Sequence, residues 1–368
     1  MIISRYLIKE VLDTLFAVTA VLLLIVLSNQ LVRYLSYAAS GKIGTNILLQ
    51  LLGFETPPLI AILLPLGFYL GIMLAYGRLY ADNEMSVLNA CGFSTRRLLF
   101  VTSLFAVLVS LTVVALTLWV NPIVAAKKQR VIAQDNIINT LQSGRFHVIN
   151  GGKRVIYVEK ISRDRKEASN IFIAERRDSA MHKDNQWIVL SAKQGYQMKE
   201  PVTRDRFIVA ADGYRYDGVP GQNNYKIVEF GKYAVRLALA GMENKRQREE
   251  VLPTAQLWKE YQNPDYAAEL QWRISLPISA FLLALMAIPF SHVKPRQGRY
   301  SLLLPAILIY VIYFNLLFVA RNWVEQKFVS VDFGMWWVHG IMFVLAMALI
   351  LVQSRANLKA YVMRRMSA

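Results

Sequence analysis

The sequence predicts an α-helical membrane protein whose six transmembrane helices are split three and three around an inserted β-rich domain. Three observations predict this class. The 368 residues are 55% hydrophobic with a mean hydropathy of +0.33, which is more apolar than a soluble domain can bury. Six apolar stretches are long enough to cross a bilayer, and Lys and Arg residues gather in alternate connections between them.

Each apolar stretch is about 20 residues long, the length at which a helix crosses the hydrocarbon core with its backbone groups paired. The predicted spans are 12–35, 56–79, 98–121, 270–291, 300–321 and 334–353. We expect the first to be retained, because Lys9, Glu10 and Asp13 precede its apolar run Leu15–Leu27 and it lacks a small-residue cleavage site. The predicted parts of the chain are two membrane halves, 1–121 and 270–368, and an extramembrane part, 122–269.

The short connections predict the orientation of the spans. One side of the predicted membrane holds Arg5, Lys9, Arg78, Arg96, Arg97, Lys294, Arg296, Arg299, Arg355, Lys359, Arg364 and Arg365. The opposite short connections, 36–55 and 322–333, hold only Lys42 and Lys327. Basic loops stay in the cytoplasm, so we expect a multi-pass bacterial inner-membrane protein with cytoplasmic termini and a periplasmic 122–269 domain. The net charge of +17 then indicates membrane topology rather than nucleic-acid binding.

Short alternating runs rich in Val, Ile, Tyr and Phe predict strands in the inserted domain. These runs are 154–160, 170–175, 186–191, 195–199, 206–210 and 225–230, and they fit an antiparallel sandwich or jelly roll. Alternation predicts that Val155, Tyr157, Ile171 and Ile173 line one side, where an acyl chain could lie. An ordinary filled core is the alternative reading. The charged stretch 241–266 is predicted to be a linker with a short interfacial helix.

The connection between the second and third spans predicts a short amphipathic helix at 82–92. Asp82 is expected to cap it, Glu84 to lie at its positive end and Gly92 to close it. Its candidate contact residues are Asp82, Glu84, Met85, Leu88 and Cys91. The helix could dock in a groove of another protein or lie on the bilayer. The acidic first turn favours a protein, since anionic lipid would select Lys and Arg.

Cationic and amide side chains at the predicted periplasmic level are candidates for binding a lipid headgroup. Gln30 and Arg33 lie three apart on the first span, and an Arg there could hold a phosphate or simply reach ordinary headgroups. Arg273 begins the fourth span and Arg321 ends the fifth. Each has a neighbouring Trp, and interfacial anchoring is the alternative to substrate binding for both.

Two glycines of the second span, Gly67 and Gly71, lie four residues apart. This spacing places both on one helix face, where the missing side chains allow a neighbouring helix to approach closely. The pair therefore predicts a helix contact.

Several kinds of chemistry lack their sequence signatures. The chain contains neither a phosphate-cradling Gly-x-x-x-x-Gly-Lys-Ser/Thr loop nor a His-Glu-x-x-His metal helix. Its four histidines are far apart, and its single cysteine, Cys91, excludes an intrachain disulfide. We therefore expect no cofactor, no metal site and no catalytic activity of its own.

Four segments resemble the LptF/LptG family of permeases of lipopolysaccharide export: 1–7, 83–94, 269–273 and 294–299, which read MIISRYL, NEMSVLNACGFS, ELQWR and KPRQGR. The resemblance covers the whole chain and is of the LptF type. It implies a permease that lifts lipopolysaccharide out of the periplasmic leaflet. Its implied partners are the homologous permease LptG, two copies of the ATPase LptB, the periplasmic bridge protein LptC, lipopolysaccharide and membrane lipids.

The resemblance also implies roles for individual parts of the chain. The helix at 82–92 would be a coupling helix seated in the ATPase, with Glu84 facing that partner. The inserted domain would be a β-jelly roll with an open apolar interior that passes lipid chains. Arg33 matches a basic position near the lipid phosphates, whereas Gln30 stands where family members often have a second basic residue.

Two other functions are weighed against transport. A membrane enzyme would need clustered carboxylates, histidines or a nucleophile near the bilayer surface, and none converges in the sequence. A mechanical transducer would relay motion of an ATPase to the periplasm without carrying lipid. Crosslinking of lipid inside the β-domain distinguishes transduction from transport.

Overall fold

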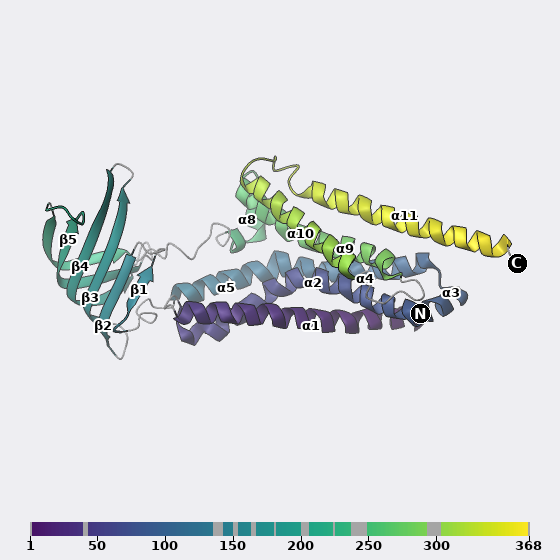
Figure 1. Ribbon diagram of the computed structural model, residues 1–368, viewed down its shortest axis with the longest axis horizontal. Helices are drawn as coiled ribbons and strands as arrows, with labels where there is room; N and C mark the ends of the chain where they lie inside the picture. The colour runs from purple at the N-terminus through teal and green to yellow at the C-terminus, as the bar shows by residue number, and fades with distance from the viewer. Residues whose placement is uncertain are drawn as a thin grey trace. The chain divides into compact units, whose positions relative to one another are not determined.

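The computed structural model describes residues 2–39, 43–134, 143–149, 154–162, 167–179, 182–199, 206–223, 225–236, 249–292 and 303–366. The chain forms two compact units. The helical unit comprises Met1–Gln30, Leu52–Lys128 and Glu249–Ala368, and the β-rich unit comprises Leu31–Leu51 and Gln129–Arg248. Figure 1 shows the ribbon with its element labels.

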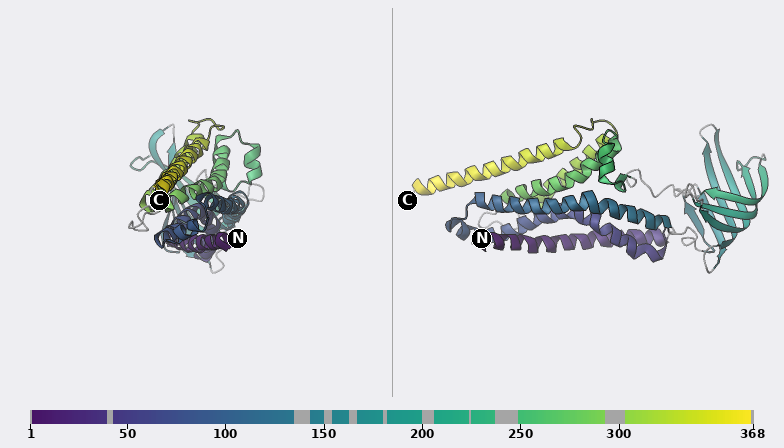
Figure 2. Two further views of the ribbon diagram at one scale, coloured as in Figure 1. Left: turned by 90° about the vertical axis from the view of Figure 1, so that its right-hand side faces the viewer. Right: turned by 180° about the vertical axis from the view of Figure 1, so that it is seen from behind.

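Six helices are long and apolar enough to cross a membrane, three before and three after the strands, so the predicted number and split are confirmed. The helices are α1 (Ile2–Ala39), α2 (Leu48–Ala81), α3 (Glu84–Ala90), α4 (Thr95–Ala115), α5 (Asn121–Gln134), α8 (Thr254–Lys259), α9 (Pro264–Ser291), α10 (Leu303–Glu325) and α11 (Trp336–Met366), with a short 3-10 turn η1 (Thr45–Ile47) and a π-helical segment η2 (Leu116–Val120). Helix α9 packs against α4, α10 and α11 (Figure 2). Its central position explains why most of its side chains are buried.

The predicted glycine contact is present between α1 and α2. A Cβ atom at Gly71 would lie 3.2 Å from both the Cα and the backbone nitrogen of Leu15, and one at Gly67 would collide with the Thr19 hydroxyl. Because the neighbours of Gly71 are backbone atoms, a side chain at this position would separate the two helices.

A proline explains the π-helical segment that follows α4. Pro122 has no amide hydrogen, and its ring would clash with the carbonyl four residues earlier, that of Leu118. The wider turn of η2 relieves this clash. The Leu118 carbonyl instead accepts a hydrogen bond of 2.7 Å from the Thr254 hydroxyl, which lies far away in sequence.

The β-rich unit contains one six-stranded antiparallel sheet whose strands follow in chain order. The strands are β1 (Phe146–Ile149), β2 (Arg154–Ile161), β3 (Glu167–Ser179), β4 (His182–Lys199), β5 (Arg206–Gly218) and β6 (Lys226–Arg236). The described strands therefore form a meander in a single curved sheet (Figure 1) rather than the two facing sheets of a sandwich. Strand β1 was not predicted, and the two predicted runs 186–191 and 195–199 belong to one strand, β4.

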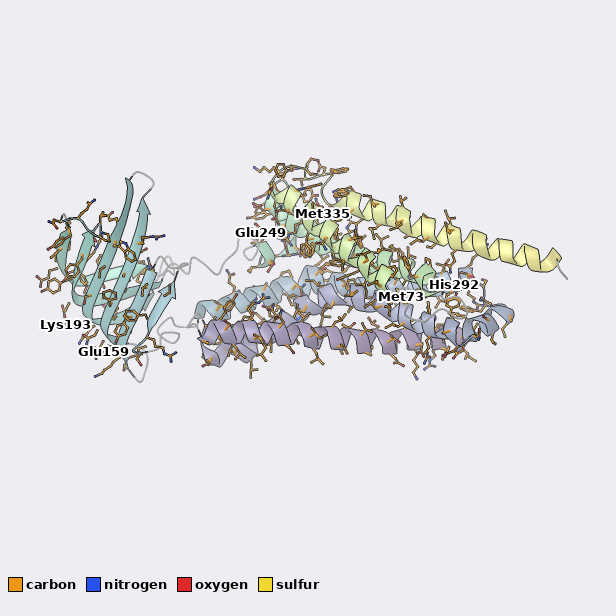
Figure 3. The ribbon with its side chains drawn as sticks, viewed as in Figure 1. Met73, Glu159, Lys193, Glu249, His292 and Met335 are labelled. Atoms are coloured by element: carbon orange, nitrogen blue, oxygen red, sulfur yellow. The ribbon has the colours of Figure 1, made fainter. Side chains whose placement is uncertain are left out.

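A bend that crosses the sheet explains why the sequence predicted two strands where the structure has the single strand β4. The pairing of the strands is interrupted at Glu159, Asn170, Lys193, Asp212 and Gly231, which lie between paired neighbours in one transverse row that we call the bend line. Asn170 and Asp212 have positive φ values of 51° and 52°. Figure 3 labels Glu159 and Lys193 of this row. Two consecutive residues are exposed here, so buried and exposed side chains no longer alternate with a period of two. In the sequence this interruption looks like a turn between two strands.

One face of the sheet carries its apolar core. The core residues are Ile156, Val158, Ala168, Ile171, Ile173, Leu190, Ala192 and Ala210, all at most 5% exposed. In β3 the buried position moves from Ile171 to Ala168 across the bend line, a step of three instead of two. The bend therefore keeps the same face apolar along the whole strand.

Candidate functional site

The short helix α3 connects two spans at one end of the helical unit. Its N-cap is Asn83 in the left-handed conformation (φ 59°), not Asp82, so the predicted capping residue was wrong. Its C-terminus is as predicted: Gly92 has φ +86°, its amide donates to Asn89 O, and the Phe93 amide donates to Leu88 O, both at 3.0 Å. These two bonds form a Schellman motif, which only a residue tolerant of positive φ completes readily.

Helix α1 is fastened to this connection. The Tyr6 hydroxyl donates a hydrogen bond of 2.8 Å to Glu84 Oε2, and Arg78 forms a 2.8 Å ion pair with Glu10. Between these contacts on α1, Leu7 is fully buried. The first turns of α1, the end of α2 and α3 therefore form one packed assembly.

The predicted coupling residues differ in their exposure. Met85 is buried in the helical core and Leu88 packs against it, whereas Asp82 and Cys91 are exposed. Glu84 is half-buried, and no hydrogen bond to its Oε1 occurs within the described part of the chain. Of these five residues, Met85 and Leu88 therefore hold α3 on its own unit, and Asp82, Glu84 and Cys91 retain accessible surface.

Gln30 and Arg33 follow each other on one side of α1. Arg33 is exposed and makes no ion pair with the residues that the structure describes. The Gln30 Oε1 atom is buried without a hydrogen-bond partner in the same described set. This site therefore offers one available cation beside an unsatisfied amide oxygen.

Arg273 lies in the third turn of α9 and is 3% exposed. Its Nε donates to Glu269 Oε1 at 2.8 Å. Its terminal nitrogens donate to the Leu252 carbonyl and the Thr254 hydroxyl, both at 3.0 Å, and to the carbonyls of Glu249 and Glu250 at 3.3 and 3.1 Å. A guanidinium has five N–H donors, so this one is saturated by the protein.

Arg321 of α10 completes the same buried network. It donates to Glu269 Oε2 at 2.8 Å and to Glu325 Oε1 at 2.9 Å, and its guanidinium lies 5.3 Å from the centre of the Trp272 ring. Glu269 thus bridges two arginines, one with each carboxylate oxygen. A buried carboxylate is tolerated only when it is compensated in this way.

This geometry corrects the prediction that Arg273 and Arg321 contact lipid. Both side chains are at most 5% exposed, and their charges are compensated by Glu269 and Glu325. The alternative of interfacial anchoring is also inconsistent with such burial. Their Trp neighbours suggested a bilayer surface, but Trp272 is itself buried against Arg321. Both arginines instead connect protein segments.

Gln271, which was not predicted as a site residue, forms a separate group of polar contacts. Gln271 donates to the Tyr261 hydroxyl and to the Val331 carbonyl, both at 2.7 Å, and accepts from the Met335 amide at 2.9 Å. Figure 3 labels Met335 and Glu249 at this end of the helical unit, away from His292. A carboxylate and an Arg spaced i, i+4 at the start of an apolar helix were the signal that could have predicted a buried pair.

A second buried polar group joins three helices. His339 of α11 is hydrogen-bonded through Nδ1 to the Tyr313 hydroxyl at 2.6 Å and through Nε2 to the Ser275 hydroxyl at 2.9 Å. Such bonds between helices fix the packing of α9, α10 and α11. The described residues contain no group of three or more His, Cys, Asp or Glu side chains that could hold a metal ion.

The four residues predicted to line one surface of the β-domain lie on two faces. The register pairs Tyr157 with Phe172 and Val158 with Ile171, so Ile171 and Ile173 belong to the apolar core whereas Val155 and Tyr157 point to the opposite face. The prediction that all four residues share a face was wrong. It assigned the inward-facing residues of each strand separately, without the register that relates β2 to β3.

The face that carries Val155 has its own apolar row. Paired residues cross all six strands in the order Val148, Val155, Ala174, Val189, Tyr216 and Ile227. Three of them, Val148, Tyr216 and Ile227, are 39% to 58% exposed. The sheet therefore offers two apolar surfaces, one enclosed and one open.

Comparison with known proteins agrees with this architecture. The model of the family "Lipopolysaccharide export system permease LptF/LptG" matches residues 5–352. The chain is 30% identical over 320 residues to the lipopolysaccharide export system permease protein LptF of Escherichia coli K12 and to that of Shigella flexneri, with 85% of each chain covered. The match spans both groups of membrane helices and the strands between them. The chain therefore belongs to the LptF/LptG family of lipopolysaccharide export permeases.

Proposed function

We propose that the chain is the permease subunit that extracts lipopolysaccharide from the periplasmic leaflet of the bacterial inner membrane and passes it through its β-rich unit toward the outer membrane. The family match over residues 5–352 carries this proposal, because it includes the membrane helices and the inserted sheet together. The distribution of Lys and Arg supports cytoplasmic termini and a periplasmic sheet.

The energy source in this proposal is a separate ATPase. Helix α3 would be the coupling helix, with the available Oε1 of Glu84 accepting a hydrogen bond from a cationic group of that ATPase. A homologous permease, two ATPase copies and a periplasmic bridge protein would complete the machine. The permease chain itself would need no cofactor.

Arg33 is the proposed contact for the lipid phosphate. An exposed guanidinium on a membrane helix can bind a phosphate through two N–H donors. Beside it, the Gln30 amide contributes no charge, so more of the phosphate charge would be balanced by the partner permease.

The test is reconstitution of the chain with its ATPase and permease partners in liposomes that contain lipopolysaccharide. ATP-driven release of lipid should fall in Arg33→Glu and Glu84→Ala, whereas Lys42→Glu, which makes the same charge reversal nine residues later in the sequence, serves as the control. Release that is unaffected by both variants would reject these residue roles.

A mechanical transducer that carries no lipid is the competing function. A photoreactive residue at position 173, in the enclosed core, should crosslink to lipopolysaccharide during ATP turnover if lipid passes along that surface. The same residue at position 157 probes the open face. Lipid captured at neither position, with transport intact in the complex, would favour the transducer.

A further inference from the structure

The chain enters the helical unit from the β-rich unit at Glu249. Residues 249–254, which we call the return segment, run from this point to the start of α8. Arg273 of α9 forms four hydrogen bonds with this segment, three to carbonyls and one to the Thr254 hydroxyl. The remaining donor, the Nε–H group, bonds to Glu269, so the guanidinium cannot rotate away from the return segment without breaking this ion pair.

Thr254 extends this attachment to the first membrane half. Its hydroxyl accepts from Arg273 and donates to the Leu118 carbonyl, which Pro122 has deprived of its usual helical donor. The return segment is therefore bonded both to α9 and to the π-helical end of the third span. Thr254 is the only side chain that makes both bonds among the described residues.

The outgoing connection is anchored near the same place. Lys128, the last residue of the helical unit before the β-rich unit, forms a 2.6 Å ion pair with Glu55 of α2. Partial desolvation and the negative charge of Glu269 raise the pKa of Glu250, whereas Arg321 and Lys128 lower it. The incoming and outgoing connections therefore lie in one shared electrostatic environment.

We propose that Arg273 and Thr254 are positioning residues that make the return segment part of the helical body, so that a displacement of α9 is delivered directly to the chain at Glu249. We call Arg273, Thr254 and the Leu118 carbonyl the junction clamp. The effect of the junction clamp on transport rests on the proposed function. The existence of the clamp does not depend on that function.

An ordinary helix cap would be a simpler role for Thr254, but the structure assigns the cap position to Pro253, and Thr254 is the first residue inside α8. The Thr254 hydroxyl donates outside its own helix. Replacement of the hydroxyl therefore tests the clamp rather than the capping of α8.

The test compares two variants of the full chain. Thr254→Val keeps the shape of the side chain but loses both hydrogen bonds, and Thr254→Ser keeps the hydroxyl. Amide hydrogen exchange of residues 249–260 should accelerate about tenfold in Thr254→Val, because one or two net hydrogen bonds are lost there. Thr254→Ser should exchange like the parent protein. Equal exchange in all three proteins would overturn the clamp.

The same variants in the reconstituted complex test its role in transport. We expect Thr254→Val to hydrolyse ATP normally while the lipid released per ATP falls severalfold, and Thr254→Ser to retain the parent ratio. An unchanged ratio in Thr254→Val would overturn the proposed delivery of motion. If the parent complex releases no lipid at all, the proposed function fails, while the exchange result still decides the clamp.

Discussion

The Tyr6 hydroxyl donates a 2.8 Å hydrogen bond to Glu84 Oε2, and this bond joins the second turn of α1 to the first residue of α3. It leaves Oε1 without a hydrogen bond from the residues that the structure describes. Tyr6 thereby fixes the carboxylate of the residue proposed to meet the ATPase.

Replacement of Tyr6 by Phe tests this relationship. An exposed hydrogen bond contributes about 0.5–1 kcal/mol, so lipid-coupled ATP hydrolysis by the complex should fall about two- to fivefold. Glu84→Gln keeps an oxygen that Tyr6 can reach but removes the charge offered to a partner. If Tyr6→Phe hydrolyses ATP like the parent complex, the orientation of Glu84 does not depend on Tyr6.

The contact of α1 with α2 at Gly71 predicts a stability difference between two glycines of one helix. Gly71→Ala places a methyl group 3.2 Å from backbone atoms of Leu15, which should cost about 1–3 kcal/mol as the helices separate. Gly53→Ala in the same helix meets nothing within 4 Å and should be neutral or slightly stabilising. Thermal denaturation of the detergent-solubilised chain measures both, and equal midpoints would contradict the proposed close approach.

The bend line predicts a strong preference at position 212. Asp212 has φ 52°, which a β-branched side chain tolerates poorly, so Asp212→Val should destabilise the sheet by about 1–2 kcal/mol. Asp212→Asn should be nearly neutral because Asn adopts this conformation readily. Limited proteolysis of the β-rich unit in the full chain reports the difference. Similar cleavage of the two variants would show that this backbone conformation is dispensable.

Glu269 is expected to contribute more to stability than its neighbour Glu325. It compensates Arg273 and Arg321 together, so Glu269→Gln leaves two buried arginines with too little negative charge and should cost about 3–5 kcal/mol. Glu325→Gln affects Arg321 alone, at a more exposed position, and should cost less. Denaturation midpoints of the two variants give the ranking, and the reverse order would contradict the bridging role.

Local patterns predicted the features that depend on neighbouring residues along the chain. Gly92 was predicted to end α3 because only a residue tolerant of positive φ closes a Schellman motif. The spacing of Gly67 and Gly71 predicted a close helix contact for a similarly local reason, and the structure shows that the partner is α1. A short helix was predicted within the charged stretch 241–266, and the structure has one at Thr254–Lys259.

Features that depend on which face a residue presents were not predictable in this way. In the sheet, the bend line changes the phase of alternation, so Val155 and Tyr157 could not be assigned to a face without the register. Similarly, Asp82 fits the composition of an N-cap, yet the chain turns at Asn83 in the left-handed conformation.

The sequence by itself determined the six spans and their division around a β-rich insertion, because a bilayer imposes a minimum apolar length that any reader of the sequence can count. Only the tertiary structure decided the role of Arg273. An arginine near a membrane surface has the same local sequence whether it binds lipid or protein. One of its five donors is directed to Glu269, one turn earlier on the same helix, and the other four are directed to the return segment, which meets Arg273 only in the folded structure.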